Sequence, residues 1–161
     1  MLTTADIIQT LLLAVVIVQL WVSYRSFQAD HERRKKQATF EYVNAVSERF
    51  RAALNKFDEK HGIDKVVDIS NYDDDDRFIV KSYLNEIEYI CAGVNAGVFD
   101  LQILHKMMGT GLIGRHHRFQ QYINEKRQSK KTVFVEFSEV VRLLETLRPS
   151  DYSNIGKIIK S

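Results

Sequence analysis

The amino-terminal end of the chain is apolar at nearly every position. Residues 2–24 contain no Lys, Arg, Pro or Gly, and from Ile7 to Val22 only Gln9, Thr10 and Gln19 interrupt the apolar run. A helix rises about 1.5 Å per residue, so this stretch gives about 35 Å, enough to cross a hydrocarbon layer of about 30 Å. The pattern therefore predicts a transmembrane helix.

A cleaved signal peptide and a buried core helix are the two alternatives. A signal peptide has a basic start and small residues at its cleavage site, whereas this chain begins MLTTAD and its apolar run ends in the bulky sequence WVSY. A helix that packs on the core of a soluble domain still turns one face to water, and Gln9, Thr10 and Gln19 alone are too few to form that polar face. We therefore expect a permanent anchor.

The charges beside this stretch predict its orientation. On the amino side lies only Asp6, while the carboxyl side carries Arg25, Arg33, Arg34, Lys35 and Lys36. Basic residues close to a span stay on the cytoplasmic side, so we predict the amino terminus outside and the remaining chain in the cytoplasm. The same five bases are expected to contact anionic lipid headgroups, each contributing about 1 kcal/mol. A single cysteine, Cys91, suits a reducing compartment.

Helical periodicity continues beyond the anchor. Residues 25–38 are polar and contain no helix breaker. Apolar positions then recur three or four residues apart, as on one face of a helix; they are Val43, Val46, Phe50, Ala53 and Phe57. We predict one long helix that ends before Gly62, with this face in the core of the same chain; a short self-associating coiled coil is the alternative.

Four more helices are predicted after a connector at 62–75. The first begins at Asp75 or Asp76 and ends near Gly93. Caps and breakers then predict a short helix at 101–108 behind Asp100, a helix from Leu112 to Ser129, and a last helix from a Thr132 cap to Pro149. Residues 133–137 alternate as a strand would, but they have no second strand to pair with, so we assign them to the last helix.

The predicted fold class is all-α, an N-terminal single transmembrane helix that continues into a cytoplasmic helical bundle of about five helices. We divide the chain into a transmembrane helix (1–24), a polar juxtamembrane helix (25–38), the helical bundle (39–148) and a short C-terminal tail (149–161).

Two segments carry opposite charge although the net charge is only +2. Residues 58–88 hold ten acids and four bases, and residues 102–131 hold seven bases and one acid. These segments can pair within one chain or between chains. A net charge so close to neutral disfavours nucleic acid as the partner.

Several features from Tyr83 to Leu147 resemble a bacterial family of small membrane-anchored domains of unknown function. They are Asn85 and Glu88 on a helix, the sequence GVFD at 97–100, an aromatic helix with basic residues at 119–127, and an aromatic and apolar helix at 134–147. The resemblance implies a helical fold and an inner-membrane location, and it implies no activity.

Residues 109–114 spell G-x-G-x-x-G, which in dinucleotide folds holds a pyrophosphate at a helix amino terminus. That fold places a strand before the glycines, whereas the residues here have a helical pattern, so we expect a flexible connection between two helices. A narrower alternative is an anion site made by free amides at a helix start together with nearby bases. Its residues would be Gly109, Gly111, Arg115 and Arg118.

No residue spacing indicates a catalytic or metal site. His116 and His117 are adjacent and point about 100° apart on a helix, and Cys91 alone cannot complete a zinc site. The acidic run Asp73–Asp76 lacks the spacing of a calcium loop and suits a helix amino terminus. We therefore predict no catalytic residue, no metal and no cofactor.

Asn85 and Glu88 are predicted to form a structural polar bridge between two helices. Glu88 falls close to an apolar face, where a carboxylate needs a partner. The candidate partners are Arg115, Arg118 and Arg127.

The expected function is that of a non-enzymatic interaction protein of the bacterial inner membrane, with membrane lipid and either a second copy or another protein as partners. We expect a self-assembling regulatory subunit or a membrane-perturbing effector, for instance in phage defence by analogy. Gln9 and Gln19 would hydrogen-bond across neighbouring spans, at about 0.6–2 kcal/mol each. The alternatives are a nucleotide or phosphate sensor near Gly109–Arg118 and a membrane-tethered nucleic-acid binder.

Overall fold

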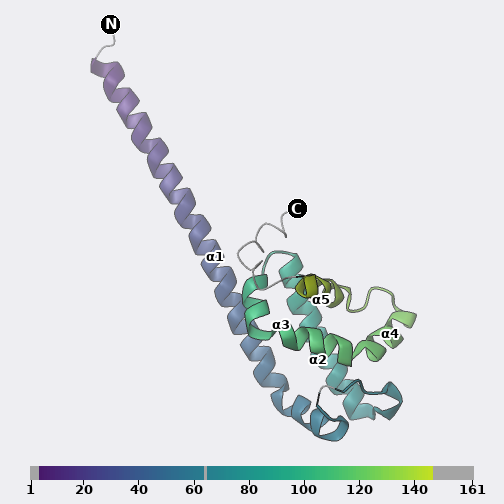
Figure 1. Ribbon diagram of the computed structural model, residues 1–161. Coiled ribbons are helices and arrows are strands. Elements are labelled where there is room, and N and C mark those ends of the chain that lie inside the picture. The colour runs from purple at the N-terminus through teal and green to yellow at the C-terminus, as the bar shows by residue number, and fades with distance from the viewer. Residues whose placement is uncertain (1–3, 64, 147–161) are drawn as a thin grey trace. The chain divides into compact units, whose positions relative to one another are not determined.

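The computed structural model describes residues 4–63 and 65–146 (Figure 1). Within these residues the chain forms five α-helices and one short 3-10 helix, with no strand, so the all-α prediction is confirmed. The elements are α1 (Thr4–His61), η1 (Ile69–Asn71), α2 (Asp74–Asn95), α3 (Leu101–Arg118), α4 (Gln120–Ser129) and α5 (Val135–Thr146). The predicted stop at Pro149 and the tail at 149–161 lie outside the described residues.

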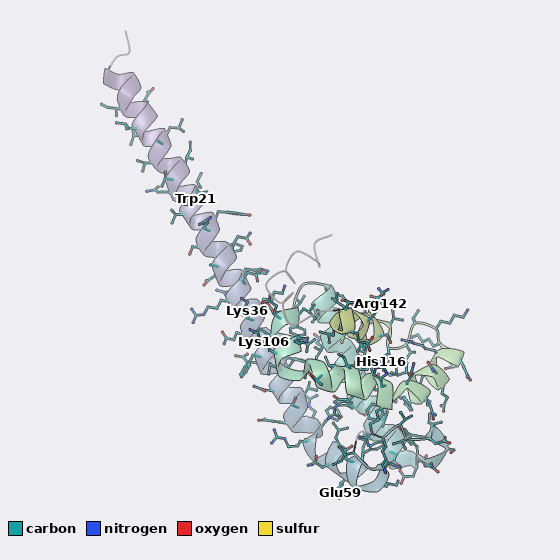
Figure 2. The ribbon with its side chains drawn as sticks, viewed as in Figure 1. Trp21, Lys36, Glu59, Lys106, His116 and Arg142 are labelled. Atoms are coloured by element: carbon teal, nitrogen blue, oxygen red, sulfur yellow. The ribbon has the colours of Figure 1, made fainter. Side chains whose placement is uncertain are left out.

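Contacts divide the chain into two compact units, residues 1–35 and residues 36–161. The first unit is the amino-terminal part of α1. Its described apolar side chains are exposed from Ile8 to Val22, and Figure 2 shows Trp21 projecting from the helix. This part of α1 is long and apolar enough to cross a membrane, and none of its most apolar window is buried as the core helix of a soluble protein would be.

The second unit has one hydrophobic core. The predicted face of α1 is turned into it, since Val43, Val46 and Phe57 are buried. In the same unit α2 packs against α5, and α3 packs against both α4 and α5 (Figure 1). Fully buried side chains from all five helices contribute to it, among them Phe57, Leu84, Leu104, Ile123 and Phe137.

Short acidic side chains begin two of the helices, largely as predicted. The Asp73 carboxylate accepts a hydrogen bond from the backbone N–H of Asp76, whose own carboxylate accepts from the backbone N–H of Asp73, a capping box that places the start of α2 at Asp74. The Asp100 carboxylate accepts from the backbone N–H of Ile103 at the start of α3. At the other end of α1, Gly62 adopts φ +83°, which a side chain would disfavour.

The predicted break at Gly109–Gly111 is wrong. Helix α3 continues through Gly109, Gly111 and Gly114 and ends at Arg118, and the chain turns at Phe119 instead. Glycine costs about 1 kcal/mol in a helix interior, and tertiary burial offsets that amount: Leu104, Leu112 and Phe119 are each almost completely buried.

The predicted Thr132 cap is also wrong. Residues 131–134 form a turn in which Phe134 has φ 56°, and α5 begins at Val135. The first amides of α5 donate to a carboxylate from α2, as described below.

Candidate functional site

The four residues of the predicted anion site do not form one. Gly109 and Gly111 lie inside α3, where backbone amides are used by hydrogen bonds within the helix, so the site loses the free amides on which it depended. The Arg115 guanidinium lies over the Tyr83 ring at 4.9 Å. Arg118 is buried and is held by partners from α1 and the turn that follows it.

Arg118 joins the end of α3 to the end of α1. Its Nη1 lies 2.5 Å from the Asp58 carboxylate, its Nη2 donates to the Gly62 carbonyl at 2.7 Å, and its guanidinium lies over the Phe57 ring. The acidic and basic segments therefore meet within one chain at this ion pair. A second pair, Arg77 with Glu125 at 3.6 Å, joins the same two segments.

The acidic run at the start of α2 is used by the fold. Asp76 is buried and accepts hydrogen bonds from Lys60 at 2.6 Å and from His61 at 2.9 Å. Burial alone would raise the pKa of Asp76, but the hydrogen bonds from Lys60 and His61 hold that pKa below its ordinary value. Among the described residues no cluster of His, Cys, Asp and Glu is arranged to hold a metal ion.

Glu88 connects α2 to α5, but through backbone amides and not through an arginine. Its carboxylate accepts from the backbone N–H of Phe137 at 2.8 Å and from that of Glu136 at 3.2 Å, in the first turn of α5. Burial raises the pKa of Glu88, and these two amides partly oppose that rise. Asn85 takes no part in this bridge; its side chain is exposed and lines a groove.

A hydrogen-bonded contact between His116 and Ser138 was missed by sequence reasoning, because the two residues are far apart in the chain. His116 Nε2 lies 3.0 Å from Ser138 Oγ, to which Arg127 Nη2 also donates at 2.8 Å. Burial lowers the pKa of His116. Arg127 also donates to the Val133 and Phe134 carbonyls, so this network holds the turn before α5. The Glu145 carboxylate lies 3.1 Å from Nε2 of the adjacent histidine, His117, and not from His116.

A cationic groove runs between α2 and α4, with a cavity volume of about 480 Å³. We call it the α2–α4 groove. Its lining consists of four bases, three aromatic rings and three other side chains: Arg77, Lys81, Lys126 and Lys130; Phe78, Tyr122 and Phe134; Asn85, Ser129 and Val133.

Two helical stripes build the groove. On α2 the lining residues include Phe78, Lys81 and Asn85, and on α4 they are Tyr122, Lys126 and Ser129. Spacings of three and four put each set on one face of its helix. The sequence signal was present in each stripe, but nothing in the sequence shows that the two stripes face each other.

The charges in the groove are only partly balanced. Glu125 lies 3.0 Å from Lys126 and 3.6 Å from Arg77, so these two bases share one carboxylate. Within residues 4–63 and 65–146, no carboxylate lies within ion-pair distance of Lys81 or Lys130. The groove therefore has a surplus of positive charge.

The family model described as a domain of unknown function (DUF4760) matches residues 9–143. The chain belongs to this family. The match extends from the apolar part of α1 into α5, and it confirms the resemblance to an uncharacterised family. No curated protein and no solved structure matches the chain.

The polar side chains of this DUF4760 member fall into two groups, those that hold helices together and those that line the groove. Asp76, Glu88 and Arg118 have partners that hold helices together. The side chains of Lys81, Asn85 and Lys130 are exposed and line the α2–α4 groove. This groove is therefore the candidate functional site of the second unit.

Proposed function

We propose that this protein is a single-pass inner-membrane protein whose helical domain acts through contacts with other proteins and not through catalysis. The observation that carries the proposal is the exposed apolar stretch of α1, residues 8–22. A helix that is apolar on every face and remains uncovered is suited to a lipid environment, because its exposure to water is unfavourable by about 25 cal/mol for each Å² of apolar surface.

The groups beside the stretch support an amino terminus outside and a domain in the cytoplasm. Arg25, Arg33, Arg34 and Lys36 are exposed and Lys35 is half-buried, and Arg34 lies 3.8 Å from the Asp30 carboxylate, so four of the five bases are exposed enough to meet lipid headgroups. The Arg25 guanidinium lies over the Trp21 ring at 4.7 Å. An indole beside a base at the end of an apolar helix is typical of a membrane interface.

The remaining polar groups of the stretch favour self-assembly. Gln9 and Gln19 are exposed, and ten residues along a helix separate them by about 80° around its axis. One neighbouring span can therefore contact both. The domain would then be gathered with its anchor, as expected of a regulatory subunit or a membrane-perturbing effector; a role in phage defence stays a prediction.

Crosslinking in native membranes tests this proposal. We expect the natural protein to form crosslinked oligomers. A Gln9→Leu and Gln19→Leu double variant should associate less, by about 3- to 30-fold in the association constant for each glutamine. Gln28→Leu, which changes an exposed glutamine of the same helix outside the apolar stretch, is the matched control and should behave as the natural protein. A natural protein that remains monomeric would overturn the self-assembly.

A further inference from the structure

Two cations of the α2–α4 groove, Lys81 and Lys130, have no carboxylate within ion-pair distance among the described residues. Four bases line the groove and no carboxylate is among its lining residues; the Glu125 carboxylate, which is not part of the lining, is shared by Arg77 and Lys126. Lys81 and Lys130 are exposed and lie on opposite sides of the groove, one on α2 and one directly after α4. Convergent unpaired cations attract a compact anion with several oxygen atoms, for which phosphate is the common biological example.

An exposed aromatic ring lies beside these cations. Phe78 is 71% exposed, whereas Val80, Tyr83 and Leu84 of the same helix are buried. Tyr122 and Phe134, both buried, form the apolar floor of the same groove. A flat ring that stacks on such a side chain gains about 1–3 kcal/mol.

Two polar side chains that also line the groove, Asn85 and Ser129, are available to select a ligand. The Asn85 amide offers both donors and an acceptor and is exposed. Ser129 Oγ donates to the Lys126 carbonyl at 2.8 Å, which leaves its lone pairs free to accept.

The size and charge of the groove indicate a small ligand. A cavity volume of about 480 Å³ lies within the range of about 300–1,000 Å³ that small-molecule sites occupy. A nucleic-acid strand would be expected to follow a longer basic path on a more basic protein, and the net charge here is +2.

We propose that the α2–α4 groove binds a nucleotide, with its base stacked on Phe78 and its phosphates held by Lys81 and Lys130. Arg77 and Lys126 add positive charge, and Asn85, one turn beyond Lys81 on α2, contacts the sugar or a phosphate. This site is separate from the residues 109–118 that the glycine pattern indicated, and it does not depend on the membrane span.

Calorimetric titration of the full chain in an uncharged detergent tests the proposal. The probes are ATP and AMP, with adenosine (base without phosphate) and ribose 5-phosphate (phosphate without base) as their separated parts. We expect ATP to bind more tightly than AMP, and AMP to bind at least tenfold more tightly than either separated part.

Variants assign the binding to the groove. Lys81→Gln with Lys130→Gln should raise the Kd for ATP at least tenfold. The matched control, Lys56→Gln with Lys106→Gln, removes the same charge from exposed positions outside the groove and should leave the Kd unchanged. Phe78→Leu should raise the Kd for AMP about 5- to 150-fold, the factor that corresponds to the lost stacking, and should leave that for ribose 5-phosphate unchanged.

Several outcomes would overturn the site. These are the absence of ATP binding at millimolar concentration, an equal effect of the groove variant and its control, and equal binding of AMP and ribose 5-phosphate. A single-stranded oligonucleotide that binds at least tenfold more tightly than ATP, with a steep salt dependence, would assign the groove to nucleic acid instead. All of these results come from detergent solution and leave the membrane proposal to its own test.

Discussion

Arg118 and Asp58 form an ion pair that is mostly removed from water. The Arg118 side chain is 7% exposed and that of Asp58 is 24% exposed. A buried ion pair adds little net stability, but the removal of one partner leaves a charge without compensation. The pair therefore fixes how the end of α3 meets the end of α1.

Asp58→Asn is predicted to lower the free energy of unfolding by about 2–4 kcal/mol, because it leaves the Arg118 guanidinium buried without a counter-charge. Urea denaturation in mild detergent measures this change. Combining Asp58→Asn with Arg118→Met should cost less than the sum of the two single variants. Arg142→Met, at an exposed arginine, is the control, with a change below about 0.5 kcal/mol. Strict additivity of the pair would contradict this account.

The raised pKa of Glu88 predicts a pH dependence. Between the ordinary value of 4.5 and the raised pKa of Glu88, the folded protein binds this proton more strongly than the unfolded chain does. The stability that Glu88 contributes is therefore full below 4.5 and falls as the pH rises through the raised pKa. Glu88→Gln resembles the protonated form at every pH.

Denaturation midpoints over a pH series should show Glu88→Gln gaining stability relative to the natural protein as the pH rises above 4.5. Glu139→Gln, at an exposed position of α5, should show no such trend. If the natural protein instead becomes more stable relative to Glu88→Gln as the pH rises, the hydrogen bonds from the α5 amides, and not burial, determine the pKa of Glu88.

At the scale of single residues, sequence reasoning succeeded where a side chain acts on its own neighbours. Asp100 caps α3 as predicted, because a cap and its amide are three residues apart. The partner of Glu88 was wrong, since that carboxylate meets backbone from an element 48 residues further along the chain. Local chemistry is visible in a sequence, whereas a partner brought by packing is not.

The elements show the same limit. Apolar spacing predicted five helices, and the structure has five α-helices among its described residues. The error lay in a boundary, because glycines were expected to end a helix that packing carries through them. Helix α3 instead holds Gly111 and Gly114 on exposed faces, where an added Cβ would have no other atom within 4 Å.

Alanine at these two glycines tests whether the residues are helical. Gly111→Ala and Gly114→Ala should each raise the free energy of unfolding by about 0.5–1 kcal/mol, because alanine loses less backbone entropy in a helix. Gly109→Ala is the matched control, since its Cβ would lie 2.9 Å from His105 Cδ2, and it should give no gain. Loss of stability at positions 111 and 114, measured by chemical denaturation, would contradict a continuous α3.

The whole molecule combines an apolar amino-terminal helix with a helical domain whose groove draws on α2 and α4. The apolar amino-terminal helix was predictable because it depends on composition over a continuous stretch. The α2–α4 groove was not predictable, because the cations on its two sides lie 45 to 53 residues apart in the sequence and only the packed bundle brings them together.

Membrane topology is the central claim, and engineered cysteines measure it most directly. The native Cys91 can stay in place, because it is buried and burial raises the pKa of its thiol, so it is a poor target for labelling. Thr3→Cys places a thiol at the amino terminus, and Asn124→Cys places one at an exposed position of α4.

Both variants are treated with a membrane-impermeant maleimide, before and after the cells are permeabilised. We predict that the thiol at position 3 is labelled in intact cells, and that the thiol at position 124 is labelled only after permeabilisation. Labelling of position 124 in intact cells, or recovery of the protein in the soluble fraction, would contradict an anchored protein with a cytoplasmic domain.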